Sequence, residues 1–164
     1  MRKLLIPLGL LSMAAVAWAC GDRLNLFTRL RSAELRSHPG LILAYPGRNA
    51  SAAVIRDLQL QPAVKKAGYR FQVVEDPAGL DSALKANKFD LVVADMANAG
   101  EVSQQASAAP SKPVLLPVAF MASKEEQSAA QKKYRFLLKA PGNPENYLAA
   151  IDQAMEWKLK TASR

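Results

Sequence analysis

The stretch Lys88-Phe89-Asp90-Leu91-Val92-Val93-Ala94-Asp95 decides the fold class of this chain. Its continuous apolar run is typical of a strand that is buried on both faces of a parallel sheet, and the run ends in the carboxylate of Asp95. A second run, Phe136-Leu137-Leu138-Lys139-Ala140-Pro141, predicts another buried strand that ends in a lysine and a proline. We therefore expect Asp95 and Lys139 at the carboxyl ends of neighbouring parallel strands, where open α/β sheets place their sites.

Strands and helices alternate along the chain from residue 41. Short apolar runs predict strands, and apolar residues at helical spacing predict the helices between them. The predicted strands cover residues 41–45, 69–74, 89–94, 114–120 and 136–138, and the predicted helices cover residues 50–67, 77–87 and 123–133. Residues 101–109 predict a short helix or a loop, and a last helix begins at Pro144 with Asn143 as its cap. This order indicates an α/β fold, a doubly wound five-stranded parallel sheet with flavodoxin-like topology.

The first residues have the parts of an export signal. Arg2 and Lys3 precede an apolar run that reaches Trp18, and this run is shorter than the roughly 20 residues that a membrane-spanning helix needs. We assign residues 1–19 to a signal peptide and predict an exported protein, periplasmic or held at the membrane through its N-terminus. Cys20, the single cysteine, lies where bacterial lipoproteins carry their lipid. A lipidated Cys20, plain cleavage and a retained N-terminal anchor are the three alternatives.

Length and charge limit the domain organisation and the class of partner. After the signal, residues 20–40 predict a tether with a short basic amphipathic helix, and residues 41–160 predict one α/β domain. The formal net charge is +8, from 22 Lys and Arg against 14 Asp and Glu. In an exported protein this excess favours an anionic membrane surface or an acidic protein partner over nucleic acid.

The predicted domain resembles the receiver domain of bacterial response regulators over roughly residues 41–157. Residues 89–96 are similar to the strand that carries the phosphoacceptor aspartate of that family, which places Asp95 at the phosphoacceptor position. Leu138-Lys139-Ala140-Pro141 is similar to the lysine-proline turn of the family, and residues 143–151 are similar to its closing helix. The resemblance implies a receiver-like fold.

The chain departs from the receiver pattern at the positions that handle metal and phosphate. Receiver domains end their first strand in a pair of acids that hold Mg²⁺ together with the phosphoacceptor, whereas this position reads Ala44-Tyr45-Pro46-Gly47-Arg48. The hydroxyl residue expected near the end of the fourth strand is Val118. Mg²⁺ needs several oxygen ligands, and phosphoryl transfer without the metal loses its main charge stabilisation. We therefore predict no metal, no cofactor and no phosphotransfer.

Other catalytic arrangements lack support in the sequence. His38 is the only histidine, and it lies in a basic turn before the domain, away from any recognisable nucleophile. No cluster of residue types typical of a metal site occurs at a suitable spacing. We therefore predict that the protein is not an enzyme and has no catalytic residues.

Three hypotheses of function follow. The first is a pseudo-receiver that acts as an interaction or scaffold module for a protein partner in the cell envelope. The second is a small-molecule or anion-binding protein whose crevice at the strand ends is lined by four residues: Tyr45, Arg48, Val118 and Lys139. The third is a receiver in which Asp95 still accepts phosphate. In any of the three, Asp95 and Lys139 are also candidates for a purely structural ion pair.

Overall fold

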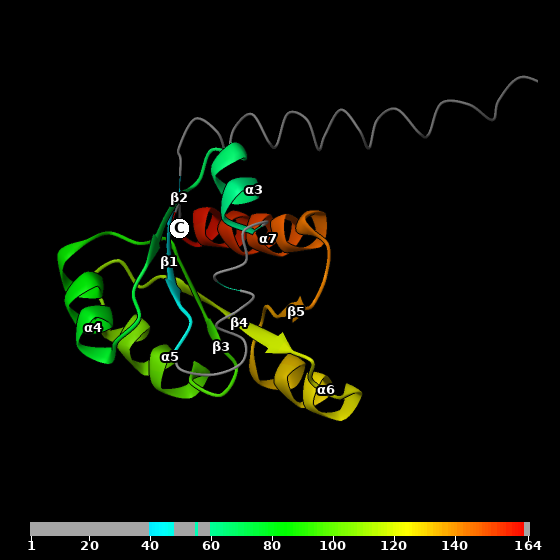
Figure 1. Ribbon diagram of the computed structural model, residues 1–164. Coiled ribbons are helices and arrows are strands. Elements are labelled where there is room, and N and C mark those ends of the chain that lie inside the picture. Colours follow the sequence, from blue (N-terminus) through cyan, green and yellow to red (C-terminus); the bar gives the residue numbers. More distant parts are fainter. Residues whose placement is uncertain (1–39, 48–54, 56–59, 163–164) are drawn as a thin grey trace, which may run out of the picture. The chain divides into compact units, whose positions relative to one another are not determined.

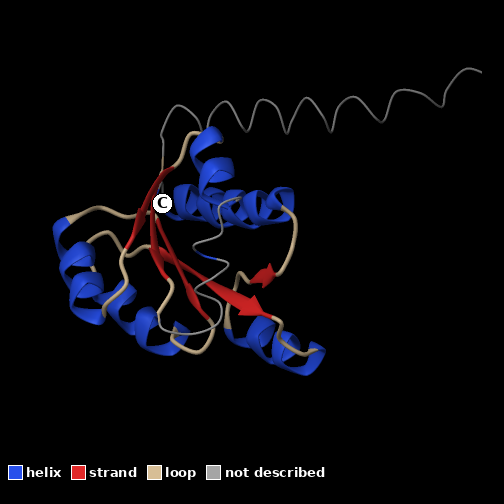
Figure 2. Cartoon of the chain, viewed as in Figure 1, coloured by secondary structure: helices blue, strands red, loops and turns tan. Residues whose placement is uncertain are grey.

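The computed structural model describes residues 40–47, 55 and 60–162 (Figure 1). Within these residues, five parallel strands form one sheet in the order β2-β1-β3-β4-β5 (Figure 2). The strands are β1 (Leu41–Tyr45), β2 (Arg70–Val73), β3 (Leu91–Asp95), β4 (Val114–Phe120) and β5 (Leu138–Ala140). The predicted α/β class and flavodoxin-like topology are therefore confirmed.

Helices cover both faces of the sheet. They are α3 (Leu60–Lys66), α4 (Pro77–Ala86), α5 (Ala99–Ala108), α6 (Lys124–Lys133) and α7 (Pro144–Ala162). Figure 1 shows α3 and α7 on one face and α4 and α5 on the other. Because parallel strands are joined by crossover helices, both faces of such a sheet become buried.

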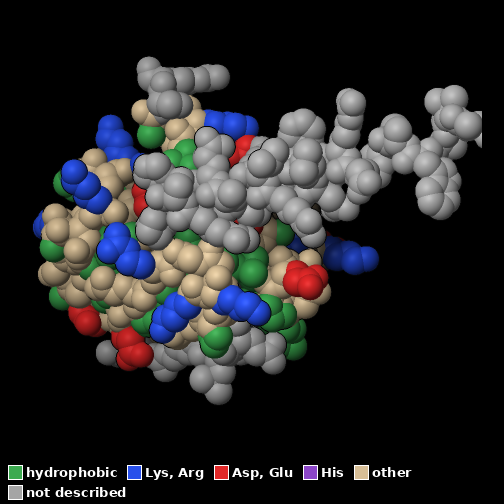
Figure 3. Space-filling model, turned by 90° about the horizontal axis from the view of Figure 1, so that it is seen from above, with side chains coloured by type: hydrophobic (Ala, Val, Ile, Leu, Met, Phe, Trp, Pro, Cys, Tyr) green, Lys and Arg blue, Asp and Glu red, His purple; other side chains and the backbone are tan. Residues whose placement is uncertain are grey.

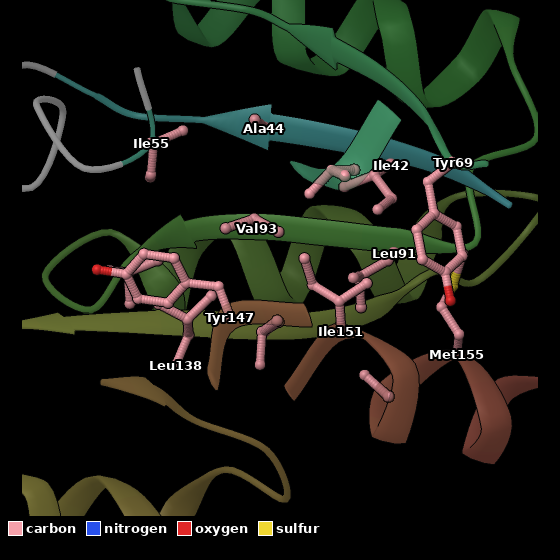
Figure 4. Packing of buried hydrophobic residues seen from close by; sticks show 14 of the residues in the cluster. Ile42, Ala44, Ile55, Tyr69, Leu91, Val93, Leu138, Tyr147, Ile151 and Met155 are labelled. Carbon is pink, nitrogen blue, oxygen red and sulfur yellow. The ribbon is translucent and has the colours of Figure 1, made fainter. Parts of the chain in front are cut away.

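Two apolar clusters fill the space between the sheet and its helices. The first packs side chains of α3 and α7 against one face of the strands and includes Ile42, Val93 and Ile151 (Figure 4). The second packs α4 and α5 against the other face and includes Val92 and Leu80. All five residues of β3 are buried, so the apolar run that predicted a central strand contributes to both clusters.

Local signals in the sequence account for the helix starts. Asp76 accepts a hydrogen bond from the Gly79 amide before α4, and Asn143 accepts one from the Asn146 amide before α7, as predicted. Ser123 and Glu126 form a capping box, in which each side chain accepts a hydrogen bond from the backbone amide of the other residue. Each cap satisfies amides that have no partner within the helix.

Some predicted boundaries move. Residues 101–109 were predicted to form a helix or a loop; residues 101–108 belong to the helix α5, and Ala109 is its C-cap. β5 begins two residues later than predicted, at Leu138. Of the predicted helix over residues 50–67, the structure describes Ile55 and α3. The predicted tether and amphipathic helix lie outside the described residues. Among the described residues, no helix is both long and apolar enough to cross a membrane.

Pro117 lies in the middle of β4, where a missing amide hydrogen ordinarily breaks a ladder. The Met96 amide donates to the Val118 carbonyl, so the backbone groups of Val118 face β3. Because the backbone groups of successive residues in a strand point to alternate sides, those of Pro117 point toward β5. The pairing of β4 with β5 begins only at Val118, opposite Leu138, so the proline lies just before this ladder.

Candidate functional site at the carboxyl edge of the sheet

The carboxyl ends of β1, β3 and β4 meet at one edge of the sheet. In register, Tyr45 lies opposite Ala94, and Asp95 lies opposite Val118. The segment after β1 leads to β2, which pairs with one side of β1, whereas β3 pairs with the other side. This reversal of strand order is the point at which open α/β sheets place their ligands. The fold brings Asp95 to this point.

Asp95 is held by its own turn. Its side chain is 7% exposed, and among the described residues it is the only charged residue in the buried class. One carboxylate oxygen accepts a hydrogen bond of 2.6 Å from the Ala97 amide, and the Asp95 carbonyl accepts one of 3.1 Å from the Asn98 amide. The short polar side chain thus forms a turn with the residue two positions later, which connects β3 to α5.

Tyr45 and Val118 were both predicted to line a crevice beside Asp95. Val118 is 1% exposed and packs in the cluster beneath α3 and α7, on the same face of the sheet as Asp95. Tyr45 is 9% exposed and packs with Ala94 in the cluster beneath α4 and α5. Since paired residues of parallel strands point to the same face, Tyr45 and Asp95 leave the sheet on opposite faces.

Lys139 does not lie on a strand next to Asp95, as we had expected. β4 separates β3 from β5, so the prediction of neighbouring strands is wrong. Leu138 and Ala140 belong to the same cluster as Val118, and alternation turns the exposed Lys139 to the other face. The ion pairs described for residues 60–162 join Lys85 to Asp81 and Lys160 to Glu156, and a pair of Asp95 with Lys139 is not among them.

Gly47 and Asn98 bring together the loops that follow β1 and β3. Gly47 has a φ of +62°, and a Cβ atom added there would lie 2.4 Å from the side-chain nitrogen of Asn98. Only glycine accommodates both the backbone conformation and the close approach. Asn98 was not among the residues predicted from the sequence, where its only signal is its position shortly after a predicted strand end. Arg48 and Cys20, the two remaining predicted site residues, lie outside the described residues.

The acids of the described chain do not converge. Among residues 40–47, 55 and 60–162, no group of three or more His, Cys, Asp and Glu side chains is placed to hold a metal ion. Residues 46–54, which follow β1, contain no Asp or Glu in their sequence.

Comparison with known proteins relies on the three-dimensional structure. No family model matches the sequence. A search of curated proteins also gives no match. Solved structures do match, and they include a CheY-like response regulator receiver domain protein from Methanospirillum hungatei, at 17% identity and a TM-score of 0.57. The alignment covers 75% of this chain and 98% of that one. The chain has the receiver fold.

Two further matches agree with this fold assignment. A response regulator from Thermotoga maritima has 14% identity and a TM-score of 0.57, with 72% of this chain and 98% of that chain covered. A structure described as an adenylate cyclase from Rhodopirellula baltica has 17% identity and a TM-score of 0.56, with 76% and 93% covered. At such low identities the receiver fold is shared, and each activity is a property of the protein that carries it.

Proposed function

We propose that this chain is a pseudo-receiver, an interaction module that keeps the receiver fold without phosphotransfer and is tethered in the cell envelope by its N-terminal segment. The observation that carries the proposal is that, among the described residues, no other acid joins Asp95 in a group placed to hold a metal ion. The structure places Tyr45, Pro46 and Gly47 at the end of β1, the strand that flanks β3 at this edge. These are the positions at which the resemblance to receivers expects the metal-holding acids.

The chemistry at this edge argues against bound magnesium. Mg²⁺ requires near-octahedral oxygen ligation at about 2.0–2.1 Å, usually with one or two carboxylates in addition to waters and phosphate oxygens. The Tyr45 side chain is directed to the opposite face from Asp95, so its hydroxyl does not supply a neighbouring ligand. A phosphoryl group transferred to Asp95 would then lack the charge stabilisation that a bound Mg²⁺ supplies to this reaction.

The same edge gives less support to a ligand crevice. Tyr45 and Val118 are packed into the two apolar clusters, where they stabilise the sheet. The exposed Lys139 is directed to the face opposite that of Asp95. The three described residues that were expected to line one crevice are therefore distributed between the core and two faces, which favours an interaction module over a binding protein that uses this edge.

Protein and membrane partners fit the charge of the chain. The net charge of +8 attracts acidic proteins and anionic lipid headgroups. Lys and Arg side chains are spread over the face seen in Figure 3 instead of gathering in one patch. Such a distribution supports broad attraction to an acidic surface, with a specific partner selected by local contacts.

Two experiments test the proposal: one measures phosphorylation of the protein, and the other measures its location in the cell. The full-length protein is incubated with acetyl phosphate, with and without Mg²⁺, and its intact mass is measured beside that of an active receiver domain. We expect no added phosphoryl group, and an addition that disappears in Asp95→Asn would overturn the proposal. Fractionation of cells that express the chain with a C-terminal tag should place it in the envelope, and Cys20→Ser should reveal whether lipid holds it there.

A further inference from the structure

A groove of about 460 Å³ opens at the other end of the sheet from Asp95. It abuts Val114, the first residue of β4, and the segment before β5, and residues of α5 and α7 complete its walls. Val118, which lies opposite Asp95, follows Val114 by four residues, so the groove and Asp95 lie about 13 Å apart along the strand. This region is therefore separate from the receiver-like site.

Aromatic rings form one wall of the groove. Tyr134, Phe136 and Trp157 line it, and each is partly exposed rather than fully buried. The rings of Phe136 and Trp157 have their centroids 6.2 Å apart and their planes at 64°, an edge-to-face contact. Such a contact holds both rings in fixed orientations, which lowers the entropy cost of binding a flat molecule against them.

Cations surround these rings. The guanidinium of Arg135 lies 5.1 Å from the centroid of the Trp157 ring, and the Lys133 ammonium lies 5.2 Å from the Tyr134 centroid. Lys112 is the third cation of the lining, and the lining residues within the described part of the chain include no Asp or Glu. The nearby Glu156 on α7 is paired with Lys160 at 2.6 Å. The described lining of the groove therefore carries three cations and no carboxylate beside an aromatic wall.

Lys158 holds the loop that presents Lys112. Its ammonium donates hydrogen bonds to the backbone carbonyls of Ser111 and Lys112, the latter at 2.8 Å, and so ties this loop to α7. Ser111 lies directly before Lys112, and its hydroxyl oxygen is buried without a hydrogen-bond partner within the described structure.

We propose that this groove binds a small aromatic anion. A flat ring would pack against Trp157 and Phe136, while Arg135, Lys133 and Lys112 would hold its phosphate, sulfonate or carboxylate group. The volume lies within the roughly 300–1,000 Å³ of known small-molecule sites. This inference depends on the groove alone and holds whether or not Asp95 accepts phosphate.

The fluorescence of Trp157 gives a direct readout. The chain contains two tryptophans, so full-length Trp18→Phe protein reports on Trp157 alone. Adenosine monophosphate and naphthalene-1-sulfonate are the aromatic anions, with adenosine as the neutral ring and inorganic phosphate as the anion without a ring. We expect saturable quenching by both aromatic anions and at least about tenfold weaker binding of the two controls. Absence of saturable quenching by both aromatic anions would overturn the proposal.

Matched variants distinguish binding in the groove from general electrostatic attraction to the positively charged protein. Arg135→Gln should weaken binding of both aromatic anions about tenfold, as expected for loss of a charge-assisted hydrogen bond. Lys124→Gln removes the same charge from the other end of α6, about 14 Å from Lys133, and should leave binding unchanged. Equal weakening by both variants, or amide shifts confined to the surroundings of Asp95, would show binding elsewhere and refute the inference.

Discussion

The hydroxyl of Tyr69 donates a hydrogen bond of 2.5 Å to a carboxylate oxygen of Asp152. Tyr69 directly precedes β2, a strand at one edge of the sheet, and Asp152 lies within α7. Figure 4 shows the Tyr69 ring in the apolar cluster near Met155, another residue of α7. The contact therefore ties an edge of the sheet to the helix that covers one face.

Tyr69→Phe should lower the free energy of unfolding by about 1–3 kcal/mol, because the variant removes a hydrogen bond to a charged group and leaves Asp152 without this donor. Urea denaturation followed by circular dichroism measures the loss. Tyr134→Phe removes the same hydroxyl from a half-buried ring at the groove and should change stability by less than about 0.5 kcal/mol. An equal loss in both variants would contradict the role assigned to Asp152.

The same pair predicts a loss of stability at alkaline pH. Burial, together with the hydrogen bond to Asp152 and its negative charge, raises the pKa of Tyr69 far above its usual value. A free tyrosine titrates near pH 10, so the contribution of the pair is complete below about pH 10 and declines as the pH rises above that value. The difference in unfolding free energy between the wild type and Tyr69→Phe should therefore shrink above about pH 10. A difference that stays constant up to about pH 12 would contradict this prediction.

Gly47→Ala should destabilise the protein through two separable effects. The positive φ costs an alanine about 1–2 kcal/mol, and the new Cβ atom would also collide with the side chain of Asn98. Combining the change with Asn98→Ala removes the collision and leaves the backbone cost. Thermal or urea unfolding of both single variants and the double variant isolates each effect. A loss for Gly47→Ala that is unaffected by the second substitution would show that Asn98 moves aside freely.

Asp95→Asn and Asp95→Ala should differ in stability. The asparagine retains a carbonyl oxygen that accepts the hydrogen bond of the Ala97 amide, whereas the alanine loses the acceptor. We expect Asp95→Ala to unfold more easily than Asp95→Asn by about 1 kcal/mol. Amide hydrogen exchange at Ala97 should speed up only in the alanine variant. Equal exchange in the two variants would mean that the side chain does not hold this turn.

Ser123→Ala should cost about 1 kcal/mol, because Ser123 caps α6 through the Glu126 amide. Urea unfolding gives the value, and hydrogen exchange within α6 shows whether the effect is local. Ser107→Ala is a matched control, since its exposed hydroxyl only donates to the Ser103 carbonyl within α5. A larger loss in the control than in Ser123→Ala would show that the cap contributes little.

The sequence determined those features of the protein that depend on local patterns. The apolar run of residues 91–94 is buried from both sides, as its composition required. Asn143 caps the helix that begins at Pro144, because a polar side chain before a proline satisfies the free amides of a first turn. The alternation of such elements permits few topologies, and the observed strand order is the predicted one.

Only the tertiary structure decided which side chains share a face of the sheet. A shift of one residue along a strand turns a side chain to the other face, and the exact register of β1 and β5 was not visible in short apolar runs. In the observed register, the side chains of Tyr45 and Lys139 point to the face of the sheet opposite that of Asp95. The groove at Trp157 and Arg135 could not be predicted from the sequence either. Its residues come from α5, the start of β4, the segment before β5 and α7, which meet only after folding. Sites built from contacts between distant segments depend on packing, whereas strands and caps depend on neighbours in the chain.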